Sequence, residues 1–166
     1  MTSGRTDGEP AVPLIPGRME RHTGCMVLKI GQVIFRLMEA QLASLGLRIR
    51  HYSVLGALKD HGPTSQQDLG TYLRIDSATM VATIDDLEKL DFVNRRRRPE
   101  DRRSYIISIT PDGEAKLDEI EALMDKLDEE YFADLTLRQH EQLHNMARKL
   151  SRGKTLVTAY DRIRGN

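Results

Sequence analysis

Six of the nine residues from Arg95 to Arg103 are arginine, and this run lies between two segments with strand-like composition. Residues 93–98 precede a turn at Pro99-Glu100-Asp101, and the β-branched segment 105–109 follows it. Two strand-like segments joined by a turn predict a two-stranded hairpin. The chain is therefore expected to carry a hairpin with an arginine-rich tip, a surface that suits a negatively charged partner.

The charge of the chain is balanced in total but separated along the sequence. Its 166 residues include 25 basic and 25 acidic ones, so the net charge gives no sign of a polyanionic partner. Eight acidic residues but only two lysines lie between Glu114 and Glu130. We therefore expect one strongly positive surface and one acidic helix. The length suits one domain with extensions.

The start of the chain and its single cysteine indicate where it acts. No apolar run reaches the roughly 18–20 residues that a membrane span requires. Residues 1–20 contain Pro10, Pro13 and Pro16 and lack the apolar core of a secretory signal, so a flexible arm is expected. Cys25 alone cannot form an internal disulfide, which suits the reducing cytoplasm.

Apolar residues spaced three and four apart predict four helices before the hairpin. The first two cover about residues 25–45, ending before Gly46, and 49–59, ending before Gly62-Pro63. A third begins near Ser65, whose hydroxyl has the pattern of an N-cap. Its residues Leu69, Tyr72 and Leu73 are expected to face the core.

The fourth helix, Asp76 to Leu90, has two different faces. One is apolar, with Met80, Ile84, Leu87 and Leu90. The other carries small uncharged residues: Ser77, Ala78, Thr79, Val81, Ala82 and Thr83. A face of hydroxyl and methyl groups without lysine or glutamate favours close approach to another surface, as a helix in the DNA major groove requires.

A long helix is expected after the hairpin. Thr110-Pro111 and the early acidic residues are typical of a helix start. Apolar residues from Leu117 to Tyr131 form a coiled-coil-like seam. Thr136 and Gln139 predict a capping box for a last helix that reaches Leu150, and the tail 151–166 permits a further helical turn or two.

Two short helices followed by a basic hairpin are the order of a winged helix-turn-helix, in which the hairpin is the wing. From Leu69 to Thr110 the chain resembles the MarR family of bacterial regulators. Asp101-Arg102-Arg103, followed by Ser108-Ile109-Thr110 and Pro111-Asp112-Gly113, is similar to that family's wing signature and its exit into the next helix. The resemblance covers about Leu28 to Leu150.

This resemblance implies a mainly α fold with a small β-hairpin wing, built from a winged helix-turn-helix lobe and a helical dimerisation region. The implied parts are a flexible arm (1–20), a MarR-like domain (21–150) and a tail (151–166). Within the domain, residues of about 48–110 would form the winged helix-turn-helix, and those of about 21–45 and 111–150 the dimerisation helices.

The implied protein is a cytoplasmic homodimer that binds a palindromic operator in double-stranded DNA, with half-sites about one helical turn apart. It would act as a repressor until a small effector changes the separation of its two lobes. The resemblance implies no cofactor.

The resemblance also implies which residues meet DNA. Asp76 to Leu90 would be the recognition helix, Arg103 would enter the minor groove with Asp101 holding its guanidinium, and Arg95 would meet the backbone. The full set is Gln66, Gln67, Ser77, Ala78, Thr79, Val81, Ala82, Arg95, Arg97, Arg98, Asp101, Arg102 and Arg103. Two positions depart from the family pattern: Ala82 stands where many members have a basic residue, and Asp91 where the helix usually ends in glycine.

Other residues leave two interpretations open. Cys25 is either a redox-sensing thiol or a packed structural one. His140 and His144 are either a metal pair or two exposed histidines, and because spacing marks no clear third and fourth ligand, no metal site is predicted. Arg36 and His51 are candidates for an effector pocket, which in this family often receives phenolic or other aromatic anions.

No enzyme activity is predicted, because the sequence has no glycine-rich phosphate loop, HExxH, GxSxG or clustered CxxC motif. The alternative class is a winged helix that binds protein. Such a wing would not need this density of arginine, and its binding would depend far less on salt.

Overall fold

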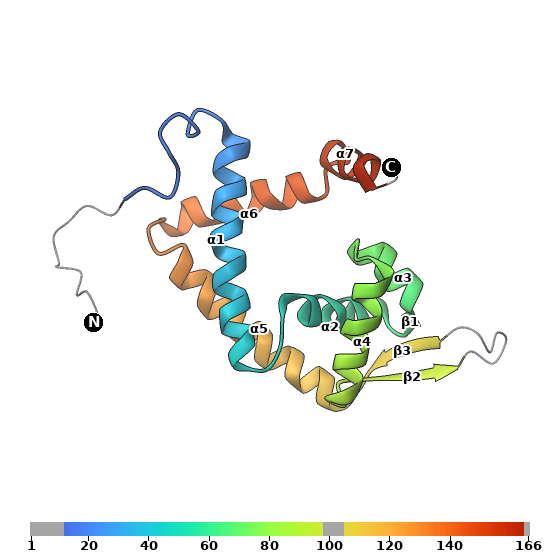
Figure 1. Cartoon of the computed structure of the whole chain (residues 1–166). Helices are drawn as coiled ribbons and strands as arrows, with labels where there is room; N and C mark the ends of the chain where they lie inside the picture. Colours follow the sequence, from blue (N-terminus) through green and yellow to red (C-terminus); the bar gives the residue numbers. More distant parts are fainter. Residues whose placement is uncertain (1–11, 98–104, 165–166) are drawn as a thin grey trace, which may run out of the picture. The chain divides into compact units, whose positions relative to one another are not determined.

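The computed structural model describes residues 12–97 and 105–164. The chain divides into two compact units, Met1–Glu121 and Ala122–Asn166, and the boundary falls inside one long helix, α5 (Pro111–Tyr131). Figure 1 labels the elements in chain order, and each unit is described below by itself.

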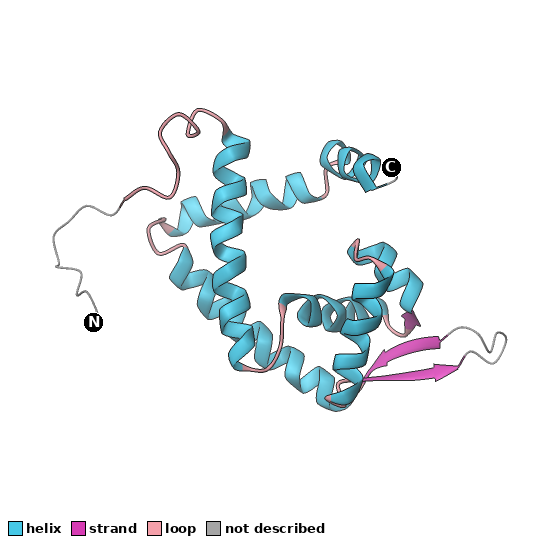
Figure 2. Cartoon of the chain, viewed as in Figure 1, coloured by secondary structure: helices cyan, strands magenta, loops and turns pink. Residues whose placement is uncertain are grey.

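The first unit carries the helix-turn-helix and the hairpin. Its elements are α1 (Thr23–Ser44), α2 (Ile49–His61), β1 (Thr64–Ser65), α3 (Gln66–Leu73), α4 (Ser77–Lys89), β2 (Val93–Arg97), β3 (Tyr105–Ile109) and the start of α5. Figure 2 shows that helix predominates and that the strands are confined to one small sheet. The predicted fold class, mainly α with a β-hairpin wing, is confirmed.

The sheet has three antiparallel strands in the order β1-β3-β2. Val93 pairs with Ile109 and Arg97 with Tyr105, so the expected hairpin forms with β3 in the centre. Strand β1 was not predicted. It consists of two residues, and Thr64 pairs with Ile107. A strand of two residues has no sequence periodicity that could predict it. It forms because its backbone pairs with the free edge of β3.

The core of the first unit joins α1, α2, α3, α4, the sheet and the start of α5. Its most completely buried side chains are Leu42, Leu47, Val54, Leu55, Leu58, Leu69, Met80, Ile84, Leu87, Val93, Ile107, Leu117 and Ile120. Helices α2 and α4 supply much of it, and on α4 the residues Met80, Ile84 and Leu87 are buried as expected. Helix α4 and the hairpin therefore pack into the same hydrophobic core, which fixes their positions relative to each other.

Two residues expected in the core are not there. Tyr72 is 54% exposed, with its ring edge against His61 at a centroid distance of 4.5 Å. Leu90 is 43% exposed, because α4 has ended at Lys89 and the chain turns there. The turn forms with Asp91 in place of the glycine usual in the family: Asp91 has a left-handed backbone with φ of 59°, as Gly46 has after α1 with φ of 72°.

The second unit contains the end of α5, α6 (Leu137–Ser151) and α7 (Lys154–Arg164). The predicted capping box is present, since Thr136 Oγ1 accepts a hydrogen bond from Gln139 N and Gln139 Oε1 accepts one from Thr136 N. The tail forms helix α7. Across the described ranges, no helix combines the length and apolarity needed to cross a membrane.

Candidate nucleic-acid interface

Side-chain caps define the two helices of the helix-turn-helix. Ser65 Oγ accepts a hydrogen bond from Asp68 N at 3.1 Å at the start of α3. Arg74 follows α3 with a left-handed backbone (φ of 54°), and Asp76 Oδ1 then accepts a hydrogen bond from Thr79 N at 2.9 Å to start α4. Both helix starts were predicted from these residue types, because a short polar side chain satisfies a free backbone N–H there.

Helix α4 buries one face and presents the other to solvent. Met80, Thr83, Ile84 and Leu87 are buried, and the Thr83 hydroxyl donates a hydrogen bond to the carbonyl oxygen of Thr79 at 2.7 Å. Ser77, Ala78, Val81 and Ala82 are exposed, while Thr79 is half-buried. The exposed surface of the first two turns of α4 therefore holds hydroxyl and methyl groups and no charged side chain from those turns. Gln66 and Gln67, in the first turn of α3, are half-buried and exposed respectively.

The three described arginines of the hairpin have different surroundings. Arg95 has a side chain only 22% exposed and forms ion pairs with Asp85 and with Glu88, the latter at 3.4 Å. Arg96 and Arg97 are exposed, and the Arg97 guanidinium lies 5.9 Å from the centre of the Tyr105 ring. Arg98, Asp101, Arg102 and Arg103 lie outside the described residues.

The placement of Arg95 changes the interpretation of its role. Both acidic partners lie on α4, so the arginine ties the base of the hairpin to that helix. Its guanidinium is already engaged by two carboxylates, whereas Arg96 and Arg97 are the exposed arginines among the described residues of the hairpin.

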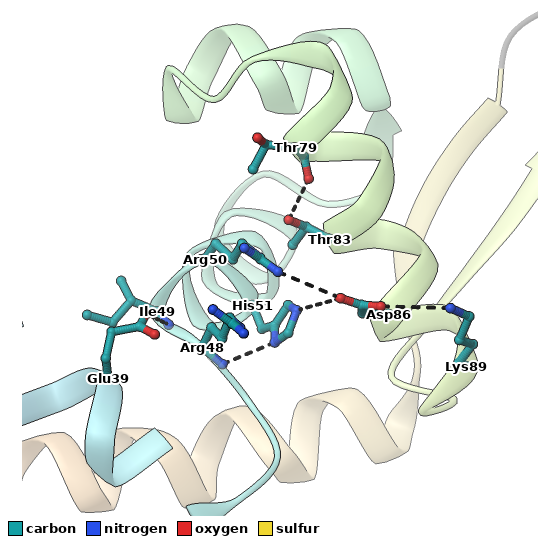
Figure 3. Close-up of polar contacts among 9 residues, drawn as sticks. All are labelled: Glu39, Arg48, Ile49, Arg50, His51, Thr79, Thr83, Asp86 and Lys89. Carbon is teal, nitrogen blue, oxygen red and sulfur yellow. Dashed lines mark hydrogen bonds and ion pairs between the residues drawn. The ribbon is translucent and has the colours of Figure 1, made fainter. Parts of the chain in front are cut away.

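His51 joins α2 to α4. The imidazole is 3% exposed, its Nδ1 accepts a hydrogen bond from Arg48 N at 3.1 Å, and its Nε2 lies 3.6 Å from Asp86 Oδ2 (Figure 3). Arg50 Nη2 is 3.8 Å from the same oxygen. Burial, followed by the charge of Arg50, lowers the pKa of His51 below its ordinary value of 6.5, although Asp86 opposes this shift.

Sequence reasoning missed Asp86, Arg50 and Glu39 as members of this cluster. Glu39 of α1 accepts a hydrogen bond from the backbone N–H of Ile49 at 2.8 Å, so it holds the same end of α2. A local signal existed for one part only: His51 stands three residues after the N-cap Arg48, which is the spacing of a capping box. The contacts with Asp86 and Glu39 join different helices and follow no local pattern.

The first unit has two described hollows beside α1. One, of about 440 Å³, is lined by Val27, Leu28, Gly31, Gln32, Phe35 and Arg36 of α1 alone. The other, of about 420 Å³, is lined by Phe35, Glu39, Arg48, Ile49, Arg50, Ser53, Leu73 and Ile75. The second combines two arginines with an aromatic ring and aliphatic side chains. Neither hollow is lined by both Arg36 and His51.

The remaining candidates have ordinary surroundings. Cys25 is half-buried near the start of α1. His140 Nε2 lies 2.9 Å from Asp128 Oδ2, and its ring stacks on Phe132. His144 is exposed. Within the part of the chain that the structure describes, no three histidine, cysteine, aspartate or glutamate side chains gather as a metal site would require.

A helix-turn-helix with a basic hairpin beside its second helix defines the winged helix-turn-helix class of DNA-binding proteins. The MarR family model matches residues 47–105, from the turn before α2 to the start of β3. The transcriptional regulator YwoH of Bacillus subtilis is 31% identical over 130 residues, which are 78% of this chain and 94% of the relative. The transcriptional repressor NicR of Pseudomonas putida is 28% identical over 118 residues, 71% of this chain and 75% of NicR.

A solved structure of BpsR from Bordetella bronchiseptica, whose DNA binding is regulated by 6-hydroxynicotinic acid, has a TM-score of 0.67 at 25% identity. The match covers 77% of this chain and 97% of BpsR. The chain belongs to the MarR family, as the wing signature indicated. It is a DNA-binding transcriptional regulator and not an enzyme.

Proposed function

We propose that the protein is a homodimeric repressor that binds a palindromic operator and releases it when a small aromatic anion binds. The observation that carries this proposal is the exposed face of α4, where small side chains stand on a helix whose opposite face is buried. A helix can approach base edges closely only if no long side chain separates its backbone from the groove.

In this proposal α4 reads the major groove and the wing meets the flanking DNA. Ser77, Ala78, Thr79, Val81 and Ala82 contact bases and phosphates, with support from Gln66 and Gln67. Arg97 contacts the backbone together with Arg98 and Arg102, and Arg103 enters the minor groove beside Asp101. Arg95 acts indirectly, since its pairs with Asp85 and Glu88 hold the wing against α4.

Exposed apolar residues in both units support the dimer. On α1, Val27, Leu28 and Phe35 are 58%, 60% and 53% exposed. On α6, Met146 and Leu150 are 58% and 54% exposed. Such rows of large apolar side chains are typical of surfaces that a partner covers. We assign residues 21–45 and 111–150 to the dimer interface, so that two recognition helices face half-sites about one helical turn apart.

The hollow between α1, α2 and α3 is the proposed effector site. Arg48 and Arg50 supply positive charge, and Phe35, Leu73 and Ile75 supply apolar walls. Its volume of about 420 Å³ suits a single small ring system. Regulation of BpsR by 6-hydroxynicotinic acid supports an aromatic acid as the class of ligand. The effector would lower DNA affinity by binding the DNA-incompetent state more tightly.

Fluorescence anisotropy with DNA enriched from random fragments tests the proposal. We expect a palindrome to bind the dimer about 10³-fold more tightly than its scrambled version near physiological salt. Sedimentation velocity on the free protein and on the complex gives the stoichiometry. Weak binding without sequence preference would contradict a specific repressor, and a monomer in the complex would contradict the palindromic operator.

The effector is tested on the same complex. Adding 6-hydroxynicotinic acid or benzoate should lower the anisotropy, and Arg48→Gln should weaken that response while Arg36→Gln, in the other hollow, leaves it unchanged. An equal response of both variants would place the ligand elsewhere. A regulator of this kind acts where the bacterial chromosome lies, so we propose the cytoplasm as its site of action.

A further inference from the structure

One imidazole ring connects the start of α2 to the recognition helix. His51 Nδ1 accepts a hydrogen bond from the backbone N–H of Arg48 at 3.1 Å, which completes the N-terminal cap of α2. An acceptor nitrogen carries no proton. The neutral ring therefore has its one proton on Nε2, the nitrogen that faces α4.

The group opposite Nε2 is the carboxylate of Asp86. Its Oδ2 is 3.6 Å from His51 Nε2 and 3.8 Å from Arg50 Nη2, and its Oδ1 is 3.8 Å from Lys89 Nζ (Figure 3). Among the described residues, Nε2 has no hydrogen-bond partner within the usual distance. A small movement of α4 toward α2 would turn the His51–Asp86 contact into a hydrogen bond, so the ring is suited to set the spacing of these helices.

We propose that neutral His51 is a positioning residue for the recognition helix, and that a second proton on its ring releases α2 from this arrangement and weakens DNA binding. The proton would be added to Nδ1. Two donors, Nδ1–H and the Arg48 N–H, would then face each other across 3.1 Å, and the hydrogen bond between them would be lost. Because the ring is 3% exposed, water cannot replace that bond without movement of the chain.

The charges around the ring favour the neutral form near pH 7. Arg48, the N-cap of α2, and Arg50 in α2 oppose a further positive charge. Lys89 of α4 lies on the far side of Asp86, and Asp86 favours protonation. Glu39 of α1 is engaged by the backbone N–H of Ile49. Burial is the largest influence, and the pKa of His51 is lowered. A histidine released from the cap has an ordinary pKa, so protonation favours the released state as the pH falls below about 6.5.

The size of the effect has an upper limit. At pH 5.5, one unit below the ordinary pKa of about 6.5, proton binding favours the released state about tenfold over the state in which the ring stays neutral. The population of the released state should therefore rise by up to about tenfold between neutral pH and pH 5.5. This part of the proposal concerns the free protein and needs no operator. The effect on DNA affinity rests on the proposed function.

The decisive variant is His51→Gln, because this chain already shows that glutamine can make the same cap. Gln139 Oε1 accepts a hydrogen bond from Thr136 N at 2.9 Å in the capping box of α6. Glutamine keeps the cap and does not titrate. The matched control is His61→Gln, which removes an exposed histidine at the other end of the same helix.

The first experiment is amide hydrogen exchange of the free protein at pH 7.5 and 5.5, corrected for the intrinsic effect of pH. Protection of the first turn of α2 and of α4 should fall several-fold at pH 5.5 in the wild type and in His61→Gln, and should stay constant in His51→Gln. An equal loss in all three proteins would overturn the proposal. So would a nitrogen NMR spectrum at pH 7.5 with the ring proton on Nδ1.

The second experiment measures affinity for the enriched palindrome at the same two pH values. Wild type and His61→Gln should lose several-fold more affinity at pH 5.5 than His51→Gln, whereas parallel behaviour would overturn the link to DNA binding. Asp86→Asn should reduce protection of α4 already at pH 7.5 while the cap of α2 stays protected; unchanged α4 protection would overturn the positioning role. If no palindrome is bound at any pH, the proposed repressor fails, and hydrogen exchange still decides the role of His51.

Discussion

A Cβ atom added at Gly113 would collide with the carbonyl oxygen of Phe92. Helix α5 therefore begins directly against the chain segment that leads from α4 into the wing. The same oxygen accepts a hydrogen bond from Thr110 N at 3.0 Å, and Thr110 Oγ1 donates to the carbonyl oxygen of Asp91 at 2.6 Å. These hydrogen bonds join the turn before the wing to the start of α5.

Gly113→Ala should destabilise the protein by about 1–3 kcal/mol, because a backbone oxygen cannot move aside as a flexible side chain can. Urea unfolding followed by circular dichroism measures the change. Gly56→Ala in α2, where an added Cβ meets nothing within 4 Å, is the control and should be neutral or stabilising. Similar stability of both variants would contradict the packing of α5 against Phe92.

Arg95 and Arg97 should separate structural from DNA-binding roles in the wing. Arg97→Ala should leave the unfolding free energy unchanged and reduce the slope of log affinity against log salt by about 1, because one phosphate contact is lost. Arg95→Ala should mainly destabilise the protein, since Asp85 and Glu88 lose their shared cation. The reverse pattern would show that Arg95 is the phosphate contact.

Residues on the exposed face of α4 should control sequence preference. Val81 is 39% exposed and fills no core space, so Val81→Ala should change the selected operator sequence more than the total affinity or the stability. The exchange Thr79→Ala is expected to act in the same direction. Sequencing of enriched DNA measures the change. Identical selected sites for wild type and both variants would mean that another element reads the bases.

The cap of α4 should respond to acid. The hydrogen bond from Thr79 N is the main cause that lowers the pKa of Asp76 below its ordinary value of 3.8. The carboxylate therefore stabilises the fold above that value and loses this effect as the pH falls through the lowered pKa. Asp76→Ala should lower the melting temperature at pH 7 and flatten its decline in acid. Asp76→Asn should keep most of the stabilisation by the cap. The control is Asp60→Ala at an exposed position on α2, which should change neither the melting temperature at pH 7 nor its decline in acid.

A charge on α1 should break the proposed dimer. Leu28, 60% exposed, would be covered by the second copy, so Leu28→Glu should give monomers in sedimentation velocity and lose operator binding. Val12→Glu, at an 81% exposed position outside the helices, is the control and should remain dimeric. A dimeric Leu28→Glu protein with full affinity would contradict an interface on α1.

Much of the fold could be predicted because it depends on neighbours in the sequence. The caps at Ser65, Asp76 and Thr136 follow from residue types that satisfy backbone groups within three residues. The apolar spacing of α4 predicted the burial of Met80, Ile84 and Leu87, whereas Thr83, assigned to the opposite face, is buried as well. Strand β1 escaped prediction because its pairing with β3 involves only two residues, and Tyr72 was assigned to the core because spacing alone does not show where a short helix meets its neighbours.

The sequence by itself determined the order of the elements, the small-residue face of α4 and the concentration of arginine in the wing. Only the tertiary structure decided which charges are free and which are paired. It placed Arg95 between two carboxylates of α4 and set His51 against Asp86. The physical reason is that helices and caps form from local contacts, whereas the partner of a charged side chain is whatever the packing of distant elements brings within a few ångströms.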